Sequence, residues 1–295
     1  MIHYLTRTVL LTIVALAGTP AFAGNSSPTA QPGSLHVLTV GVAKAKVNTK
    51  EALLPGADRN ARDVAAFFQK QEGKLYQQVQ VSQLVNEEAT RANILAELDC
   101  LQEQFQPGDM AVVHLSAHGG EHYGHWFMAA YDNPWSIWST AGRVTEQELR
   151  ERLEKLPGKV ILILDSCHSG AFGDGVSNRT VKGEAGLVVY AAALYDQYGW
   201  YNSILDHGYF TLALLEALEG KADANGDGVV TLAEVDAYVA ARVVQLTPWS
   251  KELCVRQGKP AKDQAPTMSK PASIASNSPI AVVDRPVRAM PKARD

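Results

Sequence analysis

The stretches VVHLSAHGG (112–120) and VILILDSCHSG (160–170) decide the fold that this sequence predicts. Each begins as an apolar run and ends in small and polar residues that carry reactive side chains. Buried strands of parallel sheets have this pattern, and sites form at the carboxyl ends of such strands. We therefore predict two strands of one sheet whose ends carry the functional residues.

Strand-like and helix-like patterns alternate over most of the chain. This alternation favours one α/β domain around a largely parallel sheet. A capping box, T-E-Q-E, begins at Thr145. The predicted strands are 36–42, 79–84, 110–116, 160–164 and 187–192, with a short final edge strand at 267–269; the predicted helices are 59–71, 90–104, 145–155, 209–219 and 232–244.

The two ends of the chain have a different composition. Arg7, an apolar run from Val9 to Ala17 and the small residues Ala21-Phe22-Ala23 are typical of a secretory signal peptide over 1–23. A polar linker over 24–34, a catalytic domain over 35–270 and a disordered Ser/Pro-rich tail over 271–295 are predicted to follow. We expect an exported protein, periplasmic or secreted.

Charge and composition exclude some partners. The net charge is −4 and 46% of the residues are hydrophobic, so we expect a globular enzyme with no nucleic-acid partner. After the signal peptide, no apolar segment is long enough to cross a membrane, and we predict no membrane insertion. We also expect no organic cofactor.

Three cysteines are present, Cys100, Cys167 and Cys254. An odd number in an exported protein suggests a free thiol. Cys100 and Cys254 could pair in an oxidising compartment, which would leave Cys167 free, but sequence does not give the geometry of such a bond.

Cys167 and His118 end the two deciding strands, and we interpret them as a nucleophile and its proton-transfer partner. An imidazole can take up a thiol proton and later protonate the leaving amine. The backbone N–H groups of Gly119 and Cys167 are candidates for an oxyanion hole. The alternative is that Cys167 is a small buried core residue.

Three motifs resemble the caspase/metacaspase superfamily: A-H-G at 117–119, D-S-C-H-S-G at 165–170 and L-P-G-A-D-R-N-A at 54–61. The resemblance extends from His36 to Ser269. It implies a three-layer sandwich with a mostly parallel, six-stranded caspase-type sheet, peptide-bond hydrolysis and a dyad of His118 and Cys167. The S-A-H-G at 116–119 departs from the family's usual S-G-H-G.

Substrate preference follows from resemblance and charge. Asp165 matches the metacaspase position that lines the specificity pocket, where a carboxylate would attract arginine or lysine. Leu54 stands where caspases carry the arginine that binds aspartate, and Asn60 stands where metacaspases carry a second acid. We expect a peptide or protein substrate cut after Arg or Lys. The alternative is that Asp165 only caps a strand end.

The segment D-A-N-G-D-G-V-V-T-L-A-E at 223–234 fits an EF-hand loop. It predicts a Ca²⁺ site, and an Asx-rich turn between two helices is the alternative. The expected ligands are Asp223, Asn225, Asp227, Val229 through its carbonyl, Thr231 and Glu234.

The resemblance suggests two further features. In metacaspases, calcium-binding acids lie near the positions of Asp132, Glu146 and Asp174, a weaker candidate set. The loop 173–186, with Arg179 and Lys182, occupies the place where family members cut themselves.

Two rival interpretations remain open. A zinc hydrolase could use the histidines in H-L-S-A-H-G-G-E-H-Y-G-H: His114, His118, His122 and His125, with Glu121 nearby. Strand spacing would hold His114 and His118 roughly 13 Å apart, too far for one ion. The second rival interpretation is a catalytically silent caspase-fold module that binds calcium or a partner. Oligomeric state stays open.

Overall fold

The computed structural model describes residues 33–47, 49–136, 139–172, 185–202, 206–248, 252, 256 and 263–284. Its centre is a six-stranded sheet in the order β12-β8-β7-β3-β1-β2. All neighbouring strands are parallel except β12, which is antiparallel to β8. The strands are β1 (Leu35–Gly41), β2 (Val79–Val85), β3 (Met110–Ser116), β7 (Lys159–Asp165), β8 (Gly186–Ala191) and β12 (Thr267–Ser269).

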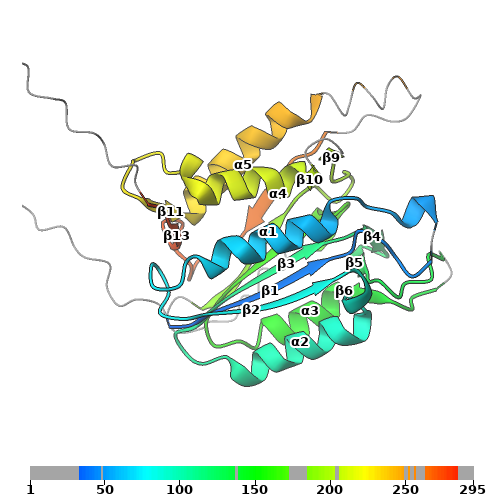
Figure 1. The fold of residues 1–295 in the computed structure, drawn as a ribbon, viewed down its shortest axis with the longest axis horizontal. Helices are drawn as coiled ribbons and strands as arrows, with labels where there is room; N and C mark the ends of the chain where they lie inside the picture. Colours follow the sequence, from blue (N-terminus) through cyan, green and yellow to red (C-terminus); the bar gives the residue numbers. More distant parts are fainter. Residues whose placement is uncertain are drawn as a thin grey trace, which may run out of the picture. The chain divides into compact units, whose positions relative to one another are not determined.

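Helices cover both faces of this sheet (Figure 1). One face carries α1, α4 and α5, and the other carries α2 and α3. The mostly parallel, six-stranded three-layer arrangement predicted from the resemblance is thus confirmed. The helices are α1 (Ala57–Gln69), α2 (Arg91–Gln104), α3 (Glu146–Leu153), α4 (Tyr209–Glu216) and α5 (Leu232–Leu246).

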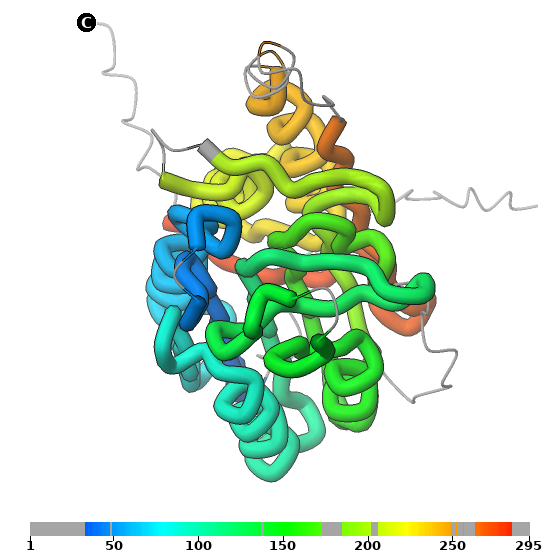
Figure 2. Tube along the Cα trace, turned by 90° about the vertical axis from the view of Figure 1, so that its right-hand side faces the viewer, coloured from blue at the N-terminus to red at the C-terminus, as the bar shows by residue number. Residues whose placement is uncertain are grey.

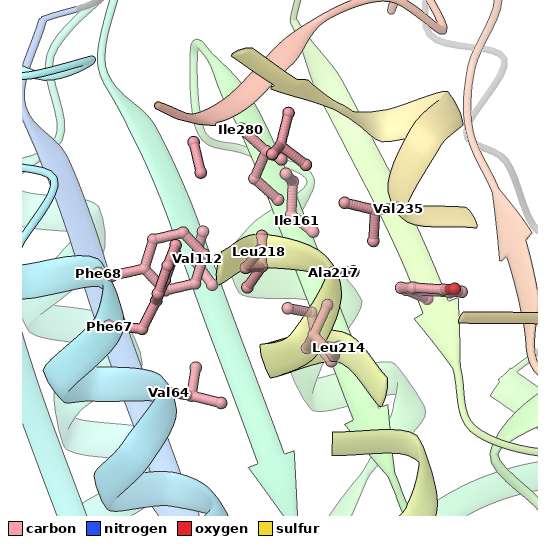
Figure 3. Close-up of a cluster of buried hydrophobic side chains, with 14 of the residues drawn as sticks. Val64, Phe67, Phe68, Val112, Ile161, Leu214, Ala217, Leu218, Val235 and Ile280 are labelled. Atoms are coloured by element: carbon pink, nitrogen blue, oxygen red, sulfur yellow. The ribbon is translucent and has the colours of Figure 1, made fainter. Parts of the chain in front are cut away.

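The strand period of two divides the core into two clusters. On β7, Ile161 and Ile163 pack toward α1, α4 and α5, while Leu162 and Leu164 pack toward α2 and α3. Figure 3 shows the first cluster, where Phe68 of α1 and Leu214 of α4 lie over the sheet. This alternation decides which helices face each polar side chain at the strand ends.

Smaller elements surround the sheet. A three-stranded antiparallel sheet, β4 (Gly119–His122), β5 (His125–Ala129) and β6 (Arg143–Thr145), follows β3. β9 (Tyr201–Asn202) pairs with β10 (His207–Gly208), and β11 (Val229–Thr231) pairs with β13 (Pro279–Val282). The short helices are η1 (Lys50–Ala52), η2 (Asn86–Glu88), η3 (Ser169–Phe172) and the π-helical η4 (Ala217–Lys221).

The predicted elements agree closely with those observed. Each of the five long strands lies within one residue of its prediction, and the edge strand 267–269 and the capping box at Thr145 are confirmed. Helix α4 ends earlier than predicted because its last turn widens into η4, where Gly220 has φ 109°.

The disordered tail predicted from residue 271 begins too early. β13 pairs with β11, and Ile280 and Ala281 are buried in the core cluster that also contains residues of α1 and α5. The apolar run P-I-A-V-V at 279–283 outweighs the Ser/Pro-rich composition around it, since burying such side chains is favourable.

Among the residues described, none of the helices is both long and apolar enough to cross a membrane. The predicted signal peptide lies outside the described residues.

Candidate active site

Two neighbouring strands position the predicted nucleophile and its partner. β3 and β7 pair in register, with Ser116 opposite Asp165 at their carboxyl ends. His118 and Cys167 each follow two residues later, and both line one cleft. Figure 2 looks onto this end of the molecule, where the loops around residues 53, 119, 167 and 199 lie side by side.

The turn after β7 packs against the backbone of residues 193–197. His168 adopts the left-handed conformation with φ 57°, and its Nδ1 lies 2.7 Å from the carbonyl oxygen of Tyr195. A side chain at Gly170 would lie 2.7 Å from the backbone nitrogen of Tyr195. Cys167, at the start of this turn, is partly exposed and lines the cleft.

The two loops approach each other most closely at Gly119. A Cβ atom there would lie 2.6 Å from both the Cys167 carbonyl oxygen and Ser166 Oγ. Ser166 Oγ in turn accepts a hydrogen bond from the buried Trp126 indole at 3.1 Å. The predicted oxyanion-hole residues, Gly119 and Cys167, therefore lie against each other, and only glycine fits on the β4 side.

His118 is held in one tautomer. Its Nε2 lies 3.3 Å from the carbonyl oxygen of Leu53, which can only accept, so Nε2 carries the proton and Nδ1 is free to take one. The Trp135 ring packs edge-on against the imidazole, with ring centroids 4.7 Å apart. Burial lowers the pKa of His118, and the Leu53 carbonyl partly opposes this effect. The imidazole is therefore neutral near neutral pH, as a general base must be.

Cys167 is a thiol in the resting structure. Burial raises the pKa of Cys167, and the nearby charge of Asp165 adds to the increase, while the backbone of Gly199 opposes it. With a neutral imidazole and a neutral thiol in one cleft, attack by the sulfur would have to be accompanied by transfer of its proton.

Asp165 belongs to a polar cluster under the cleft. The strand period turns His114, Ser116 and Asp165 toward the face covered by α1 and α4, and all three are buried. Asp165 Oδ2 accepts hydrogen bonds from Thr211 Oγ1 at 2.5 Å and from Asn60 Nδ2 at 3.0 Å. Burial raises the pKa of the Asp165 carboxyl to about 6, although the Thr211 hydroxyl lowers it.

This raised pKa predicts a pH-dependent stability. The folded protein holds a proton on Asp165 that the unfolded chain releases near pH 3.8, so the contribution of this group falls as pH rises from there to about 6. We therefore expect the free energy of unfolding of Asp165→Asn, relative to that of wild type, to increase by about 1 to 2 kcal/mol when the pH is raised from about 5 to about 8. Denaturant unfolding at both pH values measures the difference in unfolding free energy between the two proteins. A difference that does not change with pH would contradict a raised pKa for Asp165.

Several residues of this cluster give no recognisable signal in the sequence. Thr211 on α4 links Asp165 to His114, whose Nε2 lies 3.1 Å from Thr211 Oγ1. Burial lowers the pKa of His114 to about 3, which keeps this ring neutral. His207, from the β9–β10 hairpin, contacts Asn60. Only the helical spacing of the predicted α4 could have suggested that Thr211 faces the sheet.

The EF-hand-like segment forms a closed turn between η4 and α5. Asp223, Asn225 and Asp227 accept hydrogen bonds from backbone N–H groups of the same loop at 2.8 to 3.1 Å. Glu234 accepts from the backbone and hydroxyl of Thr231, completing a capping box on α5. The oxygen set suits Ca²⁺, but Glu234 would have to leave its cap to bind an ion.

Asp132 and Glu146, from the second set of candidate calcium ligands, have separate partners. Asp132 accepts a hydrogen bond from the first N–H of α2, at Arg91, and Glu146 pairs with Arg150 at 2.8 Å. Within the described part of the chain, no three or more His, Cys, Asp and Glu side chains are arranged to hold a metal ion, and the acids of the EF-hand-like loop would have to rearrange to do so.

The histidines of the zinc interpretation also separate. His114 is buried on β3 and His118 lies in the cleft, whereas His122 and His125 are exposed on the β4–β5 hairpin beside Glu121. Cys100 is an exposed free thiol. Asp174, Arg179, Lys182 and Cys254 lie outside the described residues.

Solved structures share this architecture. A protein of Geobacter sulfurreducens matches at 16% identity with a TM-score of 0.57, over 85% of this chain and all of that one. Caspase-1 from Spodoptera frugiperda matches at 13% identity with a TM-score of 0.55, over 81% of this chain and 86% of that one. A comparison with curated protein sequences gives no significant match. The family model of the caspase domain matches residues 36–273, and this chain therefore belongs to the caspase-domain family.

Proposed function

We propose that this protein is a cysteine endopeptidase that hydrolyses peptide bonds after arginine or lysine. The observation that carries this proposal is the in-register pairing of Ser116 with Asp165, which places His118 and Cys167 in one cleft above a buried carboxylate. Membership of the caspase-domain family supports cysteine peptidase activity.

The geometry supports a general-base mechanism. Nδ1 of His118 takes the thiol proton as Cys167 Sγ attacks the scissile carbonyl, while Leu53 holds the opposite ring nitrogen. His118 then returns that proton to the leaving amine, and an acyl-enzyme forms. Water, deprotonated by the same imidazole, releases the carboxylic acid and regenerates the thiol.

The charge of the cleft supports a basic substrate residue. Asp165 lines the cleft, and none of the described lining residues is Lys or Arg, so no cation is present to bind a substrate aspartate. A guanidinium would form charge-assisted hydrogen bonds with this carboxylate. A bound cation would also offset the effect of Asp165 on the pKa of Cys167, so the right substrate favours the thiolate.

A panel of otherwise identical reporter peptides with Arg, Lys or Asp before the scissile bond tests this function. We expect Cys167-dependent hydrolysis of the Arg and Lys reporters only. Cleavage of the Asp reporter alone would overturn the specificity, and hydrolysis of none of the three by the full chain would overturn the activity.

Export and self-processing extend the proposal. The charged and apolar pattern of 1–23 supports secretion, and Arg179 and Lys182 offer basic cleavage sites between β7 and β8. Both segments lie outside the described residues.

Calcium binding at the EF-hand-like loop is also proposed, and it predicts a shift in thermal stability. Calcium at about 100 times its Kd would stabilise the folded state by about 2.7 kcal/mol, and excess chelator would reverse the shift. Asp227→Asn is the matched variant, because its remaining oxygen can still accept the Val229 N–H. Equal melting temperatures of wild type with calcium and with chelator would contradict the site.

A further inference from the structure

His207 lies behind the specificity carboxylate and outside the proposed chemistry. Its ring is buried, with 7% of its surface exposed, beneath the first turns of α1. Nδ1 lies 2.8 Å from Asn60 Oδ1, and Nε2 lies 3.2 Å from Asp63 Oδ2. The ring therefore connects two residues of α1 that are three positions apart and share one face of the helix.

The hydrogen bonds of Asn60 fix which atoms donate. Its Nδ2 is 3.0 Å from both Ser116 Oγ and Asp165 Oδ2, which uses both amide protons. Its Oδ1 can only accept, so Nδ1 of His207 must donate. The bonds then run in one direction, from the ring to the amide and from the amide to the carboxylate.

The alternative orientation of the amide would be unfavourable. A flipped Asn60 would turn its oxygen toward Asp165 and its NH₂ toward the His207 N–H, so that like groups would face each other at both ends. With the His207 donor in place, only one orientation satisfies every group. Asp165 then receives an N–H that stabilises its charged form.

Charged groups around His207 belong to α1 and to its own hairpin. Asp63 faces Nε2, and Arg59 pairs with both Asp63 and Asp206 at 3.3 and 3.4 Å. Burial lowers the pKa of His207, and the charge of Asp63 opposes this. Nδ1 carries a proton both in the neutral tautomer that donates to Asn60 and in the imidazolium, whereas only the imidazolium can also donate to Asp63.

We infer that His207 is a positioning residue that sets the preference for basic substrates by locking Asn60 in the orientation that keeps Asp165 ionised. This inference rests on the proposed role of Asp165 as the reader of arginine or lysine. His207 itself touches neither the substrate nor the reacting atoms. Asn60 stands where the related metacaspases carry a second acid, and the His207–Asn60 pair gives that position a different task, orienting one carboxylate.

Two amide replacements separate the two faces of the ring. In His207→Asn the amide nitrogen can take the place of Nδ1 and donate to Asn60, whereas in His207→Gln it takes the place of Nε2 and reaches only Asp63. Both variants lose the ring, and asparagine leaves the larger void because it is one methylene shorter, so a greater loss in His207→Gln would not come from packing. We expect His207→Asn to keep kcat/KM for the Arg reporter within about 3-fold of wild type, and His207→Gln to lose about 10-fold or more.

The pH profile supplies a readout that packing alone would not move. In His207→Gln the acid limb of kcat/KM for the Arg reporter should shift to higher pH, because Asp165 loses a stabilising donor. Equal profiles for the two variants and wild type would overturn the inference while the proposed function stands. Equal losses in both variants, in step with their melting temperatures, would reduce His207 to a structural role.

A binding experiment keeps the two proposals distinguishable. N-acetyl-arginine methylamide is titrated by NMR into the full chain carrying Cys167→Ala, with and without each His207 replacement. Failure of the wild type to hydrolyse any reporter overturns the proposed catalysis. Weaker binding in the His207→Gln background alone still supports the positioning role, and unchanged binding in both backgrounds overturns it.

Discussion

Replacing Cys167 with alanine is expected to reduce peptide hydrolysis by at least about 10⁴-fold, because removal of a covalent nucleophile leaves only binding and oxyanion stabilisation. Cys100→Ala is the matched control, since this exposed thiol lies on α2 and outside the cleft. It should retain full activity. Steady-state kinetics with the Arg reporter measures both variants.

The same pair of proteins tests self-processing. Intact-mass measurement should show cleavage between 173 and 186 in the active chain and an uncut chain in Cys167→Ala. Equal fragmentation of both would contradict self-processing, and equal hydrolysis rates would remove Cys167 from the mechanism.

Replacing Asp165 with asparagine is expected to lower kcat/KM for Arg and Lys reporters by about 10²- to 10³-fold. Removing one partner of a buried charge pair costs several kcal/mol, because the substrate cation is left without its counter-ion. Activity of the wild type should also fall as pH drops through about 6, where the Asp165 carboxyl takes up its proton. In Asp165→Asn the residual activity should lose this acid limb.

A control for charge alone is available on another surface. Asp99 is half-exposed and pairs with Arg152 across α2 and α3, outside the lining of the cleft. Asp99→Asn should leave the preference among the three reporters unchanged. A similar loss in both variants would point to net charge, not to recognition at Asp165.

The sheet was predictable because its strands are continuous apolar runs. A strand such as Met110–Ser116 is buried along its whole length, so hydrophobicity marks its bounds directly. The strand β13 was not predictable, because its four residues lie among serines and prolines. It is stabilised by pairing with β11, which is distant in sequence. Local composition does not report such a long-range pairing.

Some residues of the candidate site were predictable from the sequence and others were not. Cys167 and His118 follow two strands, and parallel register alone brings strand ends together. The environment of Asp165 depends on which residues of other elements pack against its face of the sheet. Thr211 comes from α4 and His207 from the β9–β10 hairpin, both far along the chain. Their hydroxyl and imidazole groups are common on protein surfaces, so nothing in the local sequence distinguishes a buried partner from a solvated one.

The pKa directions refine the chemistry that the motif suggests. Burial keeps the thiol of Cys167 and the imidazole of His118 neutral at rest, and the Asp165 charge adds to this effect on the thiol. Under the proposed preference for arginine or lysine, the cation of the substrate would offset that charge as the scissile bond reaches the sulfur.

Covalent labelling tests whether Cys167 is the nucleophile and whether Asp165 selects a basic residue. The full chain is treated with two peptidyl acyloxymethyl ketones that differ only in carrying Arg or Asp next to the reactive carbon, and the site of attachment is read by tandem mass spectrometry. We expect one adduct, on Cys167 Sγ, formed with the Arg reagent and suppressed in Asp165→Asn. An adduct on Cys100 in place of Cys167, or equally fast labelling by the Asp reagent, would contradict this expectation.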